Sequence, residues 1–324
     1  MFLEFEHVPG LAEGKPWIGQ RYYKREDFHS TDFFYWNPSG LGAGIEDIQL
    51  GSELKLSYAA FAMDAPSVTS AANPNMPGMP PSKAMGFRND IQLRGIRLYP
   101  SGELQLGLNI IANWSNHDAD NTTTPATPAP TSHPGWSATV QHVQTLASLN
   151  GANKLAFQYG QGGGVDFGKS ASLNLDSNST RIRVVDVLTI DPTDWFGVQA
   201  GLVFQHDKGP DDTGADWISI GARGSFAFSD HVKLLLDIGH DSVMPKAVDG
   251  VDGSGDTRSL TKVTIAPALS GGRGVMTRPE LRLFVTIANW NDAARVAGVD
   301  SRGIYATTDK KMGATVGFHS EVWW

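Results

Sequence analysis

The sequence contains no cysteine in 324 residues, which excludes a disulfide framework and any thiolate-ligated metal site. It has no run of about 18 consecutive apolar residues, so no segment could form a transmembrane helix. The alternating stretch FLEFEHV directly after Met1 does not have the pattern of a cleavable leader, so we expect none in this sequence. The basic excess typical of nucleic-acid-binding proteins is absent, since the formal net charge is -8. Taken alone, these absences are typical of an acidic, soluble protein.

Sequence motifs for catalysis and metal binding are absent as well. There is no GxSxG, P-loop or dinucleotide-binding motif, and the nine histidines show no metal-ligand spacing. Residues 249–256, DGVDGSGD, are acidic like a calcium loop but lack its closing glutamate. We therefore expect no enzyme activity, no cofactor and no metal site, with only a weak case for an ion at 249–256.

The chain instead shows a two-residue hydrophobic period from end to end. In ELQLGLNI, residues 103–110, leucine or isoleucine alternates with polar residues or glycine. The same alternation recurs at 53–62, 196–204, 217–228, 232–238 and 280–287, and no sustained helical period occurs. This pattern predicts an all-β protein whose strands have one apolar and one polar face.

The connections between these strands alternate in length. Short turns such as 191–194 and 229–231 link strand pairs, whereas long polar segments such as 63–89 and 115–133 separate the pairs. Short turns at one end and long loops at the other are typical of an outer-membrane β-barrel, and less so of a soluble sandwich. The last strand, KMGATVGFHSEVWW, is amphipathic and ends on an aromatic residue, which also favours a transmembrane antiparallel β-barrel over a sandwich.

Fifteen strands are predicted, at 2–8, 17–23, 44–50, 53–62, 90–98, 103–112, 135–144, 154–161, 181–190, 195–205, 216–228, 231–241, 260–269, 278–289 and 311–324. Bacterial single-chain barrels have even strand numbers, and an open barrel would leave unpaired backbone groups in lipid. Together with the missing leader, the odd count predicts a chain that has lost its N-terminal strands.

Residues 24–43 follow a strand but do not have a strand pattern. The stretch RYYKREDFHSTDFFYW mixes charged residues with seven aromatic residues, and NPSGLGAG follows it with turn-forming residues. A segment of this composition suits a loop that folds into a barrel, where one side of the loop faces water and the other packs against the barrel wall. The alternative is a solvated loop face.

At this stretch the sequence resembles the maltoporin-type carbohydrate porins. PWIGQRYYKREDFHSTDFFYWNPSGLGAGIEDI is similar to that family's inward-folding third external loop, and MTRPELRLFVTIANW and the terminal EVWW are similar to its last segments. The resemblance implies one porin domain over 1–324, lacking about three strands of an 18-stranded barrel. It also implies a homotrimer in the bacterial outer membrane that contacts lipid and carries maltose-like oligosaccharides along a lumenal aromatic track.

The resemblance also implies which residues bind sugar. At the pore constriction, Arg25, Asp27 and Asp32 match family charges, Phe34 stands where maltoporins have tyrosine, and Asn37 replaces an aspartate.

For the aromatic track, Phe167 and Trp323 match family aromatics and Met276 falls where a tryptophan is expected. These departures leave the particular sugar open. Trp323 lies on the polar face of the last strand beside Glu321 and His319, although a wall residue packed by its neighbours could have the same position.

Three other functions remain open from the residues alone. A general or anion-selective diffusion porin would lack an aromatic track. An outer-membrane hydrolase would need a Ser–His–acid set that no pattern here requires. A soluble sugar-binding β protein would remain soluble without detergent.

Overall fold

The computed structural model describes residues 1–64, 84–115, 134–167, 177–209, 214–247, 253–297 and 310–322. Trp323, one of the expected track residues, lies outside these ranges, as does part of the acidic stretch 249–256. Among the described residues no helix is long and apolar enough to cross a membrane.

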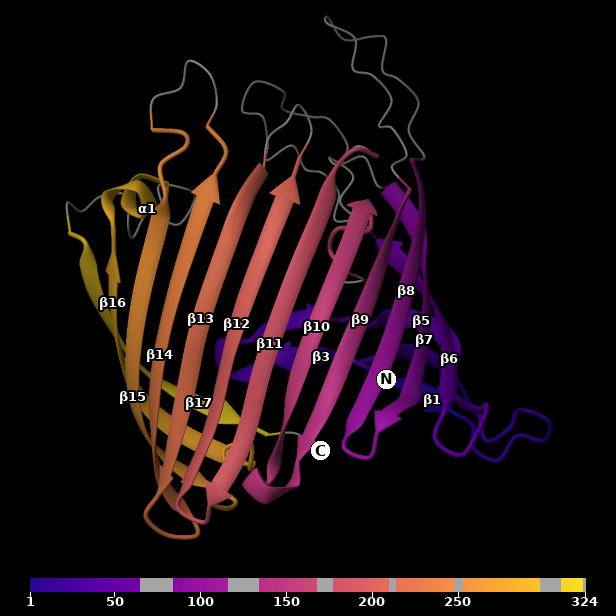
Figure 1. Ribbon diagram of the computed structural model, residues 1–324, viewed down its shortest axis with the longest axis horizontal. Coiled ribbons are helices and arrows are strands. Elements are labelled where there is room, and N and C mark those ends of the chain that lie inside the picture. The colour runs from indigo at the N-terminus through magenta and orange to yellow at the C-terminus, as the bar shows by residue number, and fades with distance from the viewer. Residues whose placement is uncertain are drawn as a thin grey trace, which may run out of the picture.

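One antiparallel sheet of fifteen strands forms the body of the protein (Figure 1). Its strands are β1 (Phe2–Glu4), β2 (Lys15–Arg21), β5 (Gly40–Gln49), β6 (Lys55–Asp64), β7 (Ala84–Tyr99), β8 (Gly102–Ser115), β9 (Gly135–Leu146), β10 (Gly151–Gly162), β11 (Thr180–Thr193), β12 (Phe196–Lys208), β13 (Gly214–Ala227), β14 (Val232–Pro245), β15 (Arg258–Ser270), β16 (Glu280–Trp290) and β17 (Met312–Glu321). Each strand pairs with the next along the chain, except that β2 pairs directly with β5. The all-β prediction is confirmed, and the fifteen expected strands are those of this sheet; the expectation that 24–43 contains no strand is wrong, because two further strands, β3 and β4, pair there with each other.

The chain between β2 and β5 leaves the sheet and forms its own small hairpin. This hairpin consists of β3 (Glu26–Phe28), the 3₁₀ turn η1 (His29–Thr31) and β4 (Phe33–Trp36). Apart from η1, the described helical elements are the 3₁₀ turn η2 (Ala147–Leu149) and the six-residue helix α1 (Asp292–Ala297). The helix α1 lies inside a connection that the sequence predicts to be irregular.

The sheet curves into an incomplete cylinder whose two faces differ in chemistry (Figure 1). On the convex face, apolar side chains are exposed, among them Ile110 (46 %), Leu283 (62 %) and Val316 (77 %). Their neighbours along the strands point to the concave face, where Asn109 and Arg282 are buried. The period of two in the sequence therefore corresponds to an apolar outer face and a polar inner face.

The two ends of the cylinder also differ as predicted. At the lower end in Figure 1, η2 and the short connections at 194–195 and 228–231 link neighbouring strands. The other connections are longer in the sequence, as between β6 and β7 (65–83) and between β8 and β9 (116–134). The edge strands β1 and β17 do not pair with each other in the described residues, so the expectation that further strands precede residue 1 stays a prediction.

Several strand boundaries differ from the alternation in the sequence. The first strand ends at Glu4 rather than at residue 8, and β7 begins at Ala84 inside an expected loop. Strands such as β7 extend beyond the alternating stretch because the hydrogen bonds between paired backbones do not require apolar side chains. Residues 40–43 belong to β5 rather than to the loop: a Cβ on Gly42 would lie 2.2 Å from the Ala60 carbonyl oxygen, so this glycine allows close strand pairing rather than a turn.

Candidate functional site

The hairpin β3–η1–β4 lies against the concave face of the sheet, behind β9 to β11 in Figure 1. Its buried side chains Phe28, Tyr35 and Trp36 pack on Val185, Val187 and Val203 of the wall. Two wall glycines make room for the rings. A Cβ on Gly107 would lie 2.3 Å from the Trp36 indole, and one on Gly201 would lie 2.8 Å from the Phe28 ring. The wall sequence is thus shaped to receive this hairpin.

Polar contacts hold the base of the hairpin to the same wall. The buried carboxylate of Glu26 accepts hydrogen bonds from Lys154 Nζ at 2.6 Å and Arg94 Nη1 at 3.1 Å. The Tyr35 hydroxyl donates to Gln141 Oε1 at 2.8 Å. Gln158 Nε2 donates to the Tyr35 carbonyl oxygen at 2.9 Å. Burial raises the pKa of the Tyr35 phenol well above its usual value, so this group remains a neutral donor.

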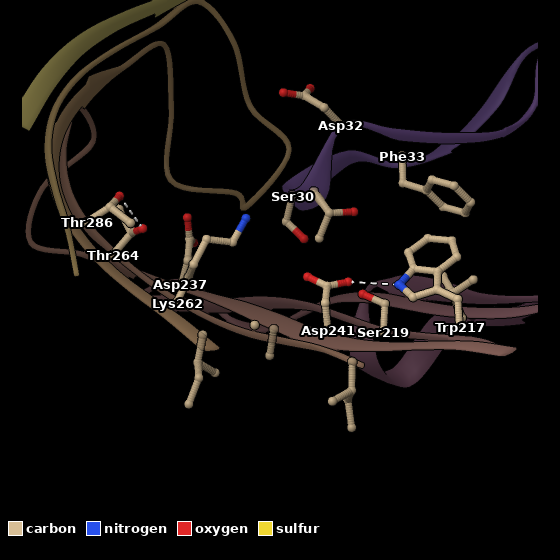
Figure 2. Close-up of a pocket in the computed structure, with 16 residues that line it drawn as sticks. Ser30, Asp32, Phe33, Trp217, Ser219, Asp237, Asp241, Lys262, Thr264 and Thr286 are labelled. Carbon is tan, nitrogen blue, oxygen red and sulfur yellow. Dashed lines mark hydrogen bonds between the residues drawn. The ribbon is translucent and has the colours of Figure 1, made fainter. Parts of the chain in front are cut away.

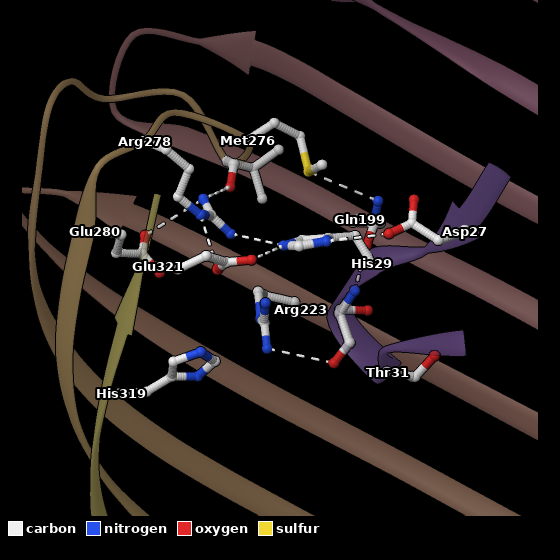
Figure 3. Close-up of polar contacts among 12 residues, drawn as sticks. Asp27, His29, Thr31, Gln199, Arg223, Met276, Arg278, Glu280, His319 and Glu321 are labelled. Atoms are coloured by element: carbon white, nitrogen blue, oxygen red, sulfur yellow. Dashed lines mark hydrogen bonds and ion pairs between the residues drawn. The ribbon is translucent and has the colours of Figure 1, made fainter. Parts of the chain in front are cut away.

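The tip of the hairpin contacts β12 and β13, the next strands of the sheet (Figure 3). The Ser30 backbone N–H donates to Gln199 Oε1 at 2.7 Å, and Arg223 donates to the Ser30 carbonyl oxygen at 3.3 Å. Asp32 closes η1 in the left-handed conformation (φ 54°), and its N–H donates to the His29 carbonyl oxygen. The tip is therefore held by backbone contacts to wall side chains.

His29 is the main side-chain contact between the tip and the last strand (Figure 3). Its Nδ1 lies 3.2 Å from Asp27 Oδ2 and its Nε2 lies 2.8 Å from Glu321 Oε1. Burial disfavours the charged imidazole, but the hydrogen bonds to the two carboxylates outweigh it, and the pKa of His29 is raised. Arg278 Nη2 also lies 2.9 Å from Nε2, a contact that only a neutral ring could accept. We favour the charged ring, because it donates to a carboxylate on each side.

The other face of the hairpin carries the charges expected at a constriction. Arg25 and Asp32 are exposed, and Asp27, Phe34 and Asn37 are partly exposed. The Arg25 guanidinium stacks over the rings of Tyr22 (4.0 Å) and Phe34 (4.9 Å). Within the described part of the chain, neither Arg25 nor Asp32 has an ion-pair partner, so both remain available to a passing solute.

The expected track residues have different surroundings. Phe167 is 1 % exposed, and the Arg183 guanidinium covers its ring at 4.6 Å. Met276 lies near the hairpin tip, where its sulfur is 3.7 Å from Gln199 Nε2. The five constriction residues thus lie on the hairpin or directly beside it, and Met276 lies near its tip. Phe167 is buried under Arg183.

A cavity of about 310 Å³ separates the hairpin tip from β13 to β16 (Figure 2). It is lined by Asp32 and Phe33 of the hairpin and by Trp217, Asp241 and Lys262 of the wall. In the residues that the structure describes, no group of three His, Asp or Glu side chains is arranged to hold a metal ion.

Sequence reasoning did not single out Glu26, His29 or Trp217. Trp217 had a usable signal, because it lies on the polar face of an amphipathic strand, as Trp323 does. Glu26 and His29 had none, since their roles depend on Lys154 and Glu321, which are far away in the sequence.

An antiparallel sheet with an apolar convex face, a polar concave face and an inserted charged hairpin defines the chain as a porin-type β-barrel protein. Comparison with protein families is consistent with this class: the chain matches the family described as LamB porin over residues 1–324. The chain therefore belongs to the LamB porin family, a family of carbohydrate-type channels of the bacterial outer membrane. The resemblance noted in the sequence is confirmed.

Proposed function

We propose that this protein carries oligosaccharides of the maltose and maltodextrin type across the outer membrane by facilitated diffusion, and that the expected constricting segment 24–43, without the residues 40–43 that belong to β5, narrows the passage. The observation that carries the proposal is the hairpin itself. It leaves the sheet, crosses the polar concave face and presents Arg25 and Asp32 without ion-pair partners in the described residues. We further propose that the protein assembles as a homotrimer, the typical state of its family.

The constriction residues suit the surface of a sugar. A pyranose ring has apolar C–H faces, against which a stiff aromatic ring such as Phe34 packs at low entropic cost. Its hydroxyl rim hydrogen-bonds to Arg25, Asp27, Asp32 and Asn37, and bonds to charged groups are about twice as strong as neutral ones. Transport needs release as well as binding, so each contact is weak and is repeated along the path.

The proposed aromatic track comprises Phe167, Met276 and Trp323. Met276 offers a soft, polarizable surface close to the hairpin tip. Phe167 lies beneath the Arg183 guanidinium and both side chains are buried, so its contact with sugar requires Arg183 to move aside. Trp323 would supply the last flat surface of the path.

The test is sugar-induced current block in planar bilayers, with maltotriose as the probe. Replacing Arg25 and Asp32 together with alanine removes bulk and two charged hydrogen-bonding groups, so ion conductance should rise. Maltotriose affinity should fall by about 1.5–3 kcal/mol for each charged hydrogen bond lost. If the natural protein conducts ions but no sugar blocks it, the chain is a general diffusion porin. If the double variant leaves conductance and block unchanged, the hairpin does not form the constriction.

A further inference from the structure

A glycine, Gly239 of β14, lies in the floor of the cavity beside the hairpin tip. Gly221 of β13 pairs directly with Gly239 of β14 on the concave face. A Cβ on Gly239 would meet only the Ile220 carbonyl oxygen, at 3.9 Å, so open space lies above this residue. Thr31 and Phe28 of the hairpin cover Gly221, whereas the wall is hollowed at Gly239, between the hairpin tip and β13 to β16.

The rim of this hollow is rich in hydrogen-bonding groups (Figure 2). On one side, Asp241 accepts a hydrogen bond from the Trp217 indole N–H at 3.1 Å. On the other side, the hydroxyls of Thr264 and Thr286 lie 2.7 Å apart. Lys262 is exposed beside them, and no described residue pairs with its ammonium group. Together these groups offer a carboxylate, hydroxyls and an ammonium toward one small volume.

One end of the hollow is aromatic. The Phe33 ring of the hairpin meets the Trp217 indole edge to face, with centroids 5.2 Å apart and planes at 80°. The two rings come from different elements, so the hollow exists only while the hairpin is seated. An apolar end and a polar rim match the two kinds of surface on a pyranose ring.

The charges of the hollow favour one class of sugar. Asp237 is neutralised by Arg223, which donates to its two oxygens at 2.7 and 2.9 Å. Asp32 and Asp241 have no cationic partner among the described residues, and Lys262 is the cation that faces them in the same cavity. The unpaired charges are therefore negative on balance, which disfavours a sugar that carries a carboxylate.

We propose that this hollow is a binding subsite for a single neutral pyranose unit, with Trp217, Asp241 and Lys262 as the residues that determine specificity. The proposal rests on the sugar transport proposed above. The volume of about 310 Å³ lies at the small end of ligand sites, which suits one ring rather than a chain of rings. Asp241 accepts from one sugar hydroxyl while Trp217 fixes its orientation, and Lys262 donates to another.

The first test fills the hollow. In planar bilayers with maltose as the probe, Gly239→Leu should weaken current block about tenfold, the factor for one lost charged hydrogen bond. The matched control is Ala314→Leu, which adds bulk on the exposed outer face of β17 and should leave block unchanged. Equal block by Gly239→Leu and the natural protein would overturn the proposal.

The second test keeps the shape and removes the charge. Asp241→Asn still accepts from Trp217, so the protein should fold normally. In liposome swelling, the natural protein should admit glucose faster than glucuronate, and Asp241→Asn should bring the two rates closer together severalfold. An unchanged ratio would contradict the assignment. A natural protein that no sugar blocks would contradict the proposed transport itself, so the two failures are distinguishable.

Discussion

The concave face has two halves that share one sequence pattern but have different surroundings. Behind the hairpin, on β8 to β12, the inward side chains are sealed, as Thr139 (2 %), Gln158 (0 %) and Val203 (1 %) show. On the middle of β14 to β17, inward groups such as Lys262 and Thr286 remain accessible. We call these regions the covered half and the open half. A polar inward position can therefore be a packing position or a solute-binding position, and the hairpin decides which.

The polar side chains of the two halves have different hydrogen-bond partners. In the covered half, polar groups bind the hairpin, as the buried Gln141 does with Tyr35 and the partly exposed Lys154 does with the buried Glu26. A buried polar group without a partner costs about 1–3 kcal/mol, so these pairings hold the hairpin in one position. In the open half, water can satisfy Lys262 and Asp241, which leaves them available for exchange with sugar hydroxyls.

The largest effect is expected from Glu26→Gln in the covered half. The change removes the charge that Arg94 and Lys154 both bind, and should destabilise the seated hairpin by on the order of 2 kcal/mol, allowing for partial exposure of Lys154. Thermal unfolding in detergent and open-channel current noise should both report the loss.

The same carboxylate-to-amide change in the open half is the control. Asp241→Asn should leave the unfolding temperature within error, because Asp241 pairs only with Trp217 in the described structure. Equal destabilisation by the two variants would remove the distinction between the halves.

A smaller loss is expected from Tyr35→Phe. The variant keeps the buried ring and removes only the hydrogen bond to Gln141, so the cost should be about 1 kcal/mol. Gln141 Nε2 still donates to Gln105 Oε1, which keeps the amide in place while its own Oε1 loses the phenol donor. The unfolding temperature should fall by less than in Glu26→Gln, and a loss equal to that of Glu26→Gln would show that the phenol does more than bind Gln141.

The smallest effect is expected from pH at the tip. The raised pKa of His29 means that its pairing with Asp27 and Glu321 is fully present below the usual histidine pKa of about 6.5, and is lost as pH rises through the raised value. Current noise from hairpin motion should therefore increase as pH rises through that range. His29→Gln should make the noise independent of pH there, and an unchanged pH response in this variant would place the titrating group elsewhere.

Much of the fold could be predicted from the sequence, because the two-residue period depends only on which face of each strand meets an apolar environment. The outward positions of Ile110, Leu283 and Val316 follow from alternation alone. The hairpin segment was also detectable, since few environments suit Arg25, Asp32 and several aromatic rings together.

The rest depends on contacts between distant residues. Gly42 resembles a turn residue but allows close strand pairing, and Gly239 looks like any strand glycine although it forms the floor of a cavity. Thr139 and Thr286 are both inward threonines, and nothing local distinguishes the buried one from the accessible one. Their difference arises from a hairpin more than 100 residues earlier in the chain.

The distinction between the two halves can be measured directly, because the chain has no native cysteine to interfere. Single cysteines at Thr139 in the covered half and Thr286 in the open half should be reacted with a charged, water-soluble methanethiosulfonate in bilayers. Thr286→Cys should react quickly and reduce the current. Thr139→Cys should react about a hundredfold more slowly, the factor for local opening that costs about 2.7 kcal/mol. Equal rates at the two positions would show that the hairpin does not cover one half of the passage, and would contradict the account.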